Sequence, residues 1–394
     1  MALKNNTWKL NQWYDQDVAG NVSYSGATEL WGWGANENGA LGQNNRTNYS
    51  SPIQIPGTTW NFPPSGNTHN AATSLFTKTD GTLWSWGYNY NGILGQNEGY
   101  PSTRHARSSP VQLPGTWDHV AVGRANALAL KTDGTLWTWG GNDYGVFGTN
   151  QSGPTKYSSP VQVPGDWSNA KIYNSNQFCT AIKSDGTLWA WGYNNYGQLG
   201  QINQTNYSSP VQIPGTTWAR CSSGNEQGMM ATKTDGTLWS WGANNYKGQL
   251  GHNNKTEYSS PKQVGTDTTW DYTADYKIAF GHYTPLAIKT DGTLWSWGYN
   301  NYGALGQNNT TDYSSPVQVP GTNWDLVSNS YGRYSMAIKT DGTLWNWGDN
   351  SSWMGGAIFG DLAQGTRRSS PVQVPGTWGN VIATRRNVFV QKVI

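Results

Sequence analysis

The sequence predicts an all-β fold, a seven-bladed β-propeller with four antiparallel strands per blade. Two observations predict it. The pattern Leu-Trp-x-Trp-Gly occurs seven times, at intervals of roughly 50 to 56 residues, which is the period expected of propeller blades. Around each copy, short apolar runs are separated by Gly, Pro, Asn and Asp turn residues, as in proteins built from many short strands. We therefore expect the 394 residues to close as one repeat array.

Tryptophan marks three fixed positions in each repeat. All but Trp8, Trp13 and Trp353 of the 24 tryptophans belong to these positions. The first set opens the pattern: Trp31, Trp84, Trp137, Trp189, Trp239, Trp295 and Trp345. The second set follows two positions later: Trp33, Trp86, Trp139, Trp191, Trp241, Trp297 and Trp347. The third set closes each unit after a turn: Trp60, Trp117, Trp167, Trp218, Trp270, Trp324 and Trp378. Such regularity indicates core packing.

One unit shows how each strand is predicted. The apolar runs 120–122 and 127–130 are the expected strands A and B, and an Asp133-Gly134 hairpin with positive φ angles follows them. Residues 136–139 alternate with period two and form strand C. After a glycine-rich loop, residues 159–165 form strand D. The prolines Pro160 and Pro164 suit an edge strand, because an edge needs fewer backbone donors.

The two ends of the chain predict how the ring closes. Residues 380–390 match strands A and B, but no strand C follows them. The first strand C, residues 30–33, lacks the Lys-Thr-Asp-Gly or Lys-Ser-Asp-Gly hairpin that precedes the other six. The last two strands are therefore expected to complete the first blade, which removes free sheet edges. We divide the chain into an N-terminal extension or docking segment, residues 1–28, and a propeller, residues 29–394.

Composition narrows the possible functions. Charged residues make up 12% of the chain and the formal net charge is +2, which argues against general nucleic-acid binding. No run of about 18 apolar residues predicts membrane insertion. The N-terminus has no apolar signal region, so a soluble protein is expected, with a virion favoured over the cytoplasm as its location. Cys179 and Cys221 are interpreted as buried small residues rather than a disulfide.

Catalytic and metal-binding patterns are not evident. The five histidines fall at unrelated repeat positions, without metal-ligand spacing. The repeated aspartates sit beside glycine in hairpins, where their expected role is turn geometry. No nucleophile elbow, phosphate loop or dinucleotide fingerprint occurs. We therefore expect a non-enzymatic protein with no cofactor and no metal.

Variable loops point to one face of the ring as the binding face. In an antiparallel blade the A–B and C–D connections share one face, and on this face they differ in length and chemistry. Loops held by a rigid scaffold commonly carry binding residues. Arginines and aromatic residues gather on connections of the second, seventh and first blades, which predicts a site for an anionic glycan or a carboxylate-rich protein surface; ordinary loop solvation is the alternative. The candidate residues are Arg46, Tyr100, Arg104, His105, Arg107, Arg333, Trp353, Arg367, Arg368, Arg385 and Arg386.

The repeats resemble the family named for the regulator of chromosome condensation. The resemblance is carried by residues 188–200, Leu-Trp-Ala-Trp-Gly-Tyr-Asn-Asn-Tyr-Gly-Gln-Leu-Gly, and by six variants of this stretch between residues 29 and 394. Near-identical repeats rich in Trp, Asn and Tyr look most like bacterial and tailed-bacteriophage members. The best-known member catalyses nucleotide exchange on a small GTPase with an inserted wedge. No comparable insertion is present, so guanine-nucleotide exchange is the least expected activity.

Three functions remain open. The first is a virion-associated tail or capsid protein for binding or host attachment, because residues 9–26 look similar to the N-termini of structural proteins of marine tailed phages. The second is a cytoplasmic protein-interaction scaffold. The third is a lectin-like glycan binder, in which Tyr88, Tyr193 and Tyr299 and the Asn after each would contact sugars; turn structure is the alternative for these pairs. Within the extension, the predicted anchors for assembly docking are Trp8, Trp13 and Tyr14.

Overall fold

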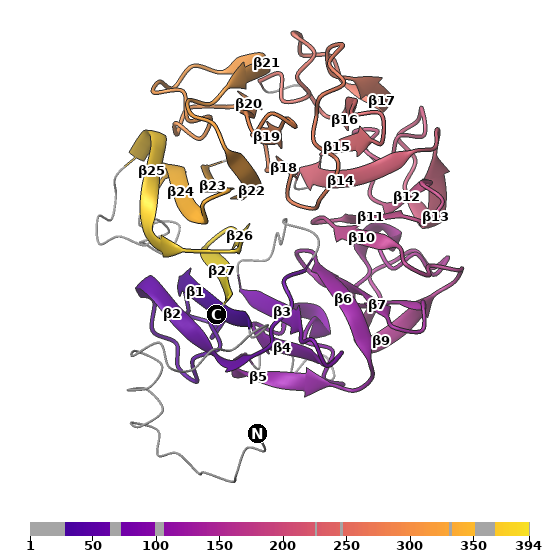
Figure 1. Ribbon diagram of the computed structural model, residues 1–394. Helices are drawn as coiled ribbons and strands as arrows, with labels where there is room; N and C mark the ends of the chain where they lie inside the picture. The colour runs from indigo at the N-terminus through magenta and orange to yellow at the C-terminus, as the bar shows by residue number, and fades with distance from the viewer. Residues whose placement is uncertain are drawn as a thin grey trace, which may run out of the picture.

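The computed structural model describes residues 28–63, 72–98, 106–224, 227–244, 247–330, 333–350 and 367–393. In these ranges the chain forms seven antiparallel sheets arranged as a ring (Figure 1). Six sheets have four described strands and one has three. The predicted seven-bladed propeller is confirmed.

The blades are numbered in chain order of their third strand, and the strands of each are given from the A to the D position. Blade 1 comprises β26 (Asn380–Ala383), β27 (Asn387–Val393), β1 (Thr28–Gly34) and β2 (Tyr49–Thr58). Blade 2 comprises β3 (Thr73–Thr77), β4 (Leu83–Gly87) and β5 (Arg107–Leu113), which take the B, C and D positions. Blade 3 comprises β6 (Trp117–Val122), β7 (Asn126–Lys131), β8 (Leu136–Gly141) and β9 (Lys156–Val163). Blade 4 comprises β10 (Lys171–Asn174), β11 (Phe178–Ile182), β12 (Leu188–Gly192) and β13 (Tyr207–Ile213).

The remaining blades follow the same order. Blade 5 comprises β14 (Trp218–Gly224), β15 (Gly228–Lys233), β16 (Leu238–Gly242) and β17 (Tyr258–Gln263). Blade 6 comprises β18 (Ile278–Phe280), β19 (Pro285–Ile288), β20 (Leu294–Gly298) and β21 (Tyr313–Gln318). Blade 7 comprises β22 (Trp324–Ser330), β23 (Tyr334–Lys339), β24 (Thr343–Asp349) and β25 (Arg367–Thr377). Two short 3-10 turns, η1 (Tyr90–Gly92) and η2 (Asp143–Gly145), lie in C–D loops.

Blade 1 closes the ring by joining the two ends of the chain. Strand β1 lies between β2 and β27, and it pairs with β27 from Thr28↔Val393 to Gly34↔Asn387. Figure 1 shows the C-terminal strands beside the N-terminal ones. The predicted closure is confirmed, and the pairing satisfies the backbone groups on one edge of β1.

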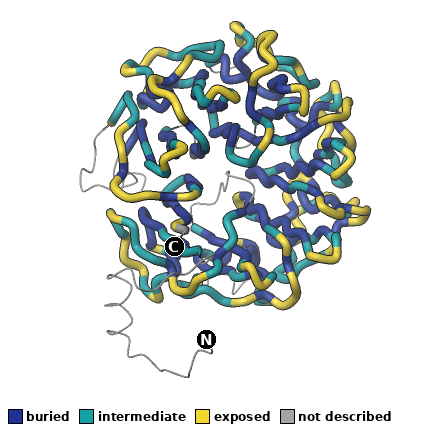
Figure 2. The backbone as a smooth tube through the Cα atoms, in the orientation of Figure 1, coloured by how far each residue is buried: buried dark blue, intermediate teal, exposed yellow. Residues whose placement is uncertain are grey.

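Burial follows strand position within each blade. In blade 3, β7 is buried along most of its length, whereas β9 is partly buried or exposed except at its last residue, Val163. Figure 2 shows the same trend, with exposed backbone mostly at the outer turns. Pro160 lies in β9, the outermost strand of its sheet, as the sequence predicted. An edge strand has no outer neighbour that requires a backbone donor.

The second tryptophan of each pattern ties neighbouring blades together. Trp139 is fully buried, and its Nε1 donates to the carbonyl of Ile93 in the preceding blade at 2.7 Å. Five equivalent bonds run from Trp86 to Ala40, Trp191 to Val146, Trp241 to Gln198, Trp297 to Gln249 and Trp347 to Ala304. Because a buried indole N–H needs an acceptor, these bonds fix the spacing between blades.

The B–C hairpins form a repeated structure with the other two tryptophan sets. In blade 3, Asp133 Oδ1 accepts from the Thr135 backbone N at 2.9 Å, and Thr135 Oγ1 accepts from Trp137 Nε1 at 2.8 Å. Lys131 Nζ lies 4.0 Å from the centroid of the Trp137 ring and 5.2 Å from that of Trp117. The expectation of positive φ angles holds only for the glycine, Gly134, at +83°. Asp133 instead stabilises the turn through its side chain.

These connections define two faces of the ring. The hairpin face carries the B–C hairpins and D–A turns, and the loop face carries the A–B turns and C–D loops. Both cysteines, Cys179 and Cys221, are buried and free, as expected.

Candidate recognition site on the loop face

A buried asparagine organises the C–D loops of blades 1 to 6. In blade 3, Asn142 is fully buried, its Oδ1 accepts from the Phe147 backbone N at 2.9 Å, and its Nδ2 donates to the Gln151 carbonyl at 3.0 Å. The asparagines of the Tyr-Asn pairs accept the equivalent bond from a backbone N–H of their own loop. They are Asn89, Asn194 and Asn300, each at most 1% exposed. The amides of these pairs therefore stabilise turns, and the tyrosines are left as surface groups.

Tyrosines from successive blades meet on the loop face. Tyr144 of blade 3 and Tyr193 of blade 4 have ring centroids 4.8 Å apart. In blade 6, Tyr299 and Tyr302 pack edge to face at 5.9 Å. Tyr144 remains 44% exposed. Partly exposed, positioned aromatic rings with polar tips are typical of recognition surfaces.

Two predicted arginines converge on one tyrosine and one carboxylate. Arg333, in the A–B turn of blade 7, and Arg367, at the start of β25, each place their guanidinium carbon 4.9 Å from the Tyr302 centroid. Both also lie 3.8 Å from the Asp349 carboxylate, which is only 1% exposed. Stacking on an aromatic face orients a guanidinium group, and the N–H edges of such a group are suited to bidentate recognition of an oxyanion.

The neighbouring turn of blade 1 brings two more predicted arginines to the same region. Tyr334, next to Arg333, donates from its hydroxyl to the Thr384 carbonyl, next to Arg385. Arg386 follows and contacts both carboxylate oxygens of Glu37, at 2.9 and 3.0 Å. Arginines far apart in sequence are thus placed on adjacent turns.

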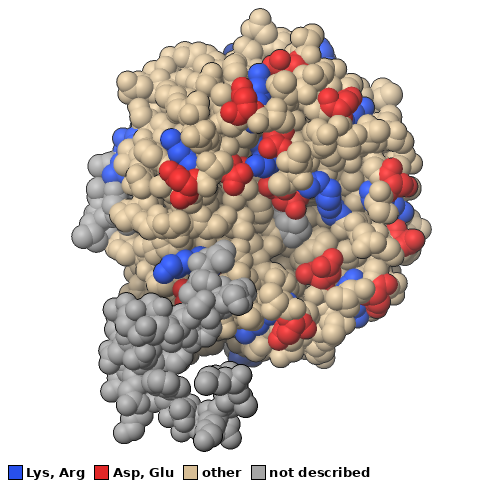
Figure 3. All heavy atoms as spheres, viewed as in Figure 1, with Lys and Arg blue, Asp and Glu red and all other residues tan. Residues whose placement is uncertain are grey.

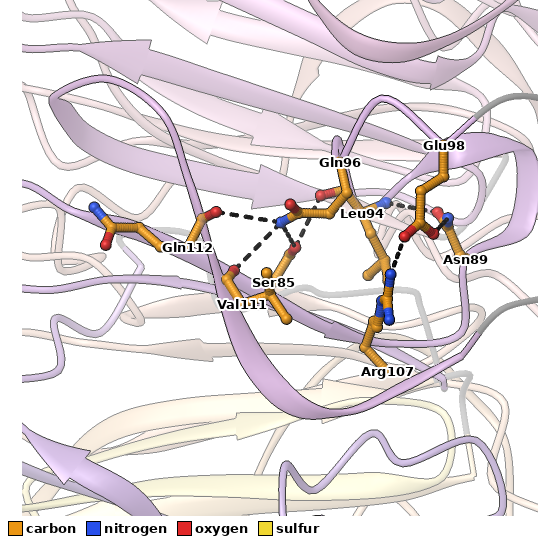
Figure 4. A network of polar contacts seen from close by, with 8 residues as sticks. All are labelled: Ser85, Asn89, Leu94, Gln96, Glu98, Arg107, Val111 and Gln112. Carbon is orange, nitrogen blue, oxygen red and sulfur yellow. Dashed lines mark hydrogen bonds and ion pairs between the residues drawn. The ribbon is translucent and has the colours of Figure 1, made fainter.

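Blade 2 contributes Arg107, which forms an ion pair with Glu98 (Figure 4). Glu98 also accepts a bond from Asn89 Nδ2 at 3.3 Å, so the pair is attached to the loop framework. The nearby Gln96 Nε2 donates to Ser85 Oγ at 3.1 Å (Figure 4). The start of β5 is linked to blade 1 because Asn44 N donates to the Ser108 carbonyl at 2.7 Å.

The structure describes seven of the eleven predicted recognition residues. Arg46 is exposed in the C–D loop of blade 1, and Arg368 lies beside Arg367 on β25. Outside the described residues lie Tyr100, Arg104, His105 and Trp353, together with the predicted anchors Trp8, Trp13 and Tyr14.

A charged cluster formed by D–A connections on the hairpin face was missed. Residues 271–277, between Trp270 and β18, extend the D–A connection of blade 6. Asp275 in this segment pairs with Arg220 of blade 5 at 2.9 Å, and Tyr276 packs against Phe62 at 6.0 Å between ring centroids. Burial raises the pKa of the Asp275 carboxyl, and Arg220 and Lys171 oppose that rise. This connection is longer than its counterparts in other repeats, and its extra length could have indicated the cluster from the sequence.

Charged side chains are sparse on the rest of the surface. Figure 3 shows basic and acidic side chains in neighbouring groups around the ring and again near its centre, with uncharged surface between them. Among the described ranges, no three His, Cys, Asp or Glu residues form a potential metal site. The described helical segments include none with the length and apolarity required to cross a membrane.

Solved structures share this architecture. Human WBSCR16 is similar with a TM-score of 0.76 and 18% identity, over 92% of this chain and 99% of that one. Prp20p from Saccharomyces cerevisiae is similar with a TM-score of 0.77 and 18% identity, over 94% of this chain and 92% of that one. At such identities the likeness shows the fold alone.

Curated relatives match shorter segments. The RCC2 homolog of Danio rerio is 39% identical over 82 residues, covering 20% of this chain and 16% of that protein. The E3 ubiquitin-protein ligase HERC2 of Homo sapiens is 29% identical over 136 residues, covering 33% of this chain and 3% of that protein. The chain thus spans only a small part of these relatives.

The family model described as the RCC1-like domain matches residues 21–334. This match covers blades 2 to 6, the β1–β2 part of blade 1 and the first strand of blade 7. The chain belongs to the RCC1-like domain family.

Proposed function

We propose that this protein is a non-enzymatic recognition module whose partner binds the loop face across blades 6, 7, 1 and 2. The observation that carries the proposal is the convergence of Arg333 and Arg367 on the Tyr302 ring. Arg385 and Arg386 follow on the adjacent turn, with the side chain of Arg386 31% exposed. Aromatic rings and arginines are the residue types that contribute most to binding energy at interfaces.

The partner chemistry follows from these groups. Guanidinium groups that are already held against an aromatic side chain lose little conformational freedom when they bind a planar oxyanion. The carboxylates Glu37, Glu98 and Asp349 hold the arginines in place, and an anionic partner would share or replace these contacts. We therefore favour an acidic glycan or a carboxylate-rich protein surface. A lectin that uses Tyr-Asn pairs is less well supported, because Asn89, Asn194 and Asn300 are buried.

The proposed setting is a tailed-phage virion, in which the propeller is the rigid head of a tail or capsid attachment protein. This part of the proposal rests on the resemblance of residues 9–26, with Trp8, Trp13 and Tyr14 as docking anchors. A cytoplasmic protein-interaction scaffold is the alternative setting. Tail or capsid genes beside the gene for this chain would favour the virion, and a small GTPase gene would favour the scaffold.

The binding proposal is tested with immobilised heparin as an acidic glycan and polyglutamate as an acidic polypeptide. We expect the protein to bind at least one of them, and the double variant Arg333→Ala/Arg367→Ala to elute at clearly lower salt. Each lost charge-assisted contact is expected to weaken binding about tenfold. The control is Lys156→Ala/Lys255→Ala, which removes two charges from exposed residues of blades 3 and 5. Equal elution of both double variants would contradict a specific site.

A further inference from the structure

The outer edge of blade 5 departs from the repeat. Six D strands continue as Pro-x-Gln-x-Pro-Gly, with Val or Ile at the first variable position. Blade 5 instead has Lys262 at that position, and Gly265, Thr266 and Asp267 replace the Pro-Gly turn. Because the other units provide the same backbone framework, the changes at this edge point to a local role rather than to a requirement of the fold.

These changes line a cleft of about 520 Å³ between blades 5 and 6. One side is the end of β17 with Lys262, and the other includes Trp295 of β20 and Pro316 of β21. Trp270 and Lys289 also line it. A concave site of this size with apolar walls and a few polar groups has the proportions of a small-molecule site. We name it the blade 5–6 cleft.

Trp270, beside this cleft, has a buried indole N–H without a described partner. In blades 3 and 4, the equivalent Trp117 and Trp167 donate from Nε1 to Pro114 and Pro164 carbonyls at 3.1 Å. Trp270 is 2% exposed, and its Nε1 has no hydrogen-bond partner among the described residues. Trp218 and Trp324 also lack a partner, but the turns before them keep Pro-Gly and their D strands carry no lysine. Among the described residues, an unpartnered indole N–H and an added cation occur together only at the blade 5–6 cleft.

The two lysines of the cleft have different surroundings. Lys289 pairs with Asp267 at 2.7 Å and lies 4.3 Å from the Trp295 centroid, so its charge is compensated. Lys262 is exposed, and its Nζ lies 2.7 Å from the Tyr258 hydroxyl. No described carboxylate lies within ion-pair distance of Lys262. Lys262 therefore offers an uncompensated positive charge at the edge of an apolar cleft.

His252 adds a neutral polar group to the same cleft. It stands where four other units have glutamine, and its Nε2 lies 3.0 Å from Ser240 Oγ. Burial, followed by the nearby Lys262 charge, lowers the pKa of His252 to about 4. At neutral pH the imidazole is therefore uncharged, and Lys262 remains the cation that an anion would meet.

We propose that the blade 5–6 cleft binds a small aromatic carboxylate. Its carboxylate contacts Lys262, and its ring lies against the partly buried Trp295 and Pro316 in the cleft wall. This site is separate from the arginine site on the loop face and does not depend on it.

The test uses 2-naphthoate and its neutral counterpart 2-naphthamide in titration calorimetry with the full chain. We expect the protein to bind the carboxylate more tightly than the amide. Lys262→Val restores the residue found in most other units, so the fold is expected to remain intact, as a thermal melt will check. This variant should weaken 2-naphthoate binding about tenfold, the effect of one charge-assisted hydrogen bond.

Two controls make the outcome decisive. Lys255→Val removes the same charge from an exposed loop position of blade 5 and should bind 2-naphthoate like the parent. Arg333→Ala/Arg367→Ala should also leave this binding unchanged, which separates the cleft from the proposed recognition site. Absence of binding by the parent, equal affinity of Lys262→Val and the parent, or equal weakening by Lys255→Val would overturn the proposal.

Discussion

The hairpin face and the loop face of the ring differ in how strictly they repeat. On the hairpin face, the same lysine, aspartate, threonine and two tryptophans recur in blades 2 to 7, with each lysine over two indoles. On the loop face, the buried asparagine recurs but the residues around it change from Tyr90 to Asp143 to Glu37. Structure is thus maintained by repeated residues, and chemical variety is left to positions that the framework does not require.

The largest expected effect comes from removing the two C-terminal strands that complete blade 1. We call their pairing with β1 the seam of the ring. Deletion of residues 380–394 removes β26 and β27, so β1 loses the partner that it pairs with along its whole length. Val381, Ile382, Val388 and Val390 would be lost from the core. We expect loss of the cooperative thermal transition, whereas deletion of residues 1–20 should change the melting temperature little. Circular dichroism melts of both proteins check this, and equal losses would show that ring integrity does not depend on the seam.

A smaller effect should separate the inter-blade contacts from the hairpin contacts. Trp139→Ala removes a fully buried ring and leaves the Ile93 carbonyl without its donor, so we expect a loss of about 3–5 kcal/mol in unfolding free energy. Trp137→Ala removes a half-buried ring of the same blade and should cost clearly less. Urea unfolding of the two variants measures the difference. If Trp137→Ala were the more damaging change, the hairpin face rather than the blade interface would hold the repeats together.

The smallest predicted effect is the response of the hairpin face to acid. Hydrogen bonds from Thr135 lower the pKa of the Asp133 carboxyl, and the same arrangement lowers the pKa of Asp341. A folded pKa below the unfolded value of about 3.9 contributes stability above that pH, and this stability is lost as pH falls through the folded pKa. Asp133→Asn/Asp341→Asn should therefore show a slightly shallower fall in melting temperature below about pH 4. An unchanged slope would mean that these carboxylates do not contribute to acid stability.

The sequence predicted the blades well because their residues are determined locally and repeated. Tryptophan spacing, period-two alternation and edge prolines each indicate one strand position, and the unmatched strands at the two ends predicted the seam. The arginine site was harder to predict, since the meeting of Arg333 and Arg367 over Tyr302 depends on the contact between blades 6 and 7. The pairing of Arg386 with Glu37 likewise joins residues from opposite ends of the chain. Neither contact has a local pattern.

Two features of the hairpin face escaped prediction, one a repeated contact and the other a departure from the repeat. The lysine of each hairpin was noted only as part of the hairpin sequence, although it lies over two indoles. The segment 271–277 lies on the hairpin face, where Asp275 and Tyr276 reach residues of other blades. Comparing each unit with the consensus of the other six would have identified this insertion and the edge of blade 5.

The position of β1 between β2 and β27 also determines the order in which the molecule can be assembled during synthesis. Strand β1 emerges from the ribosome before the six other blades. Its partner on the inner side, β27, emerges after all of them. During that interval one edge of β1 has unpaired backbone groups. The entropic cost of closing such a long loop rises only slowly with its length, so late closure within one chain remains feasible. When many chains are made close together, β26 and β27 of one chain could complete the first blade of another. The pairing that closes the ring would then be the site of strand exchange between molecules.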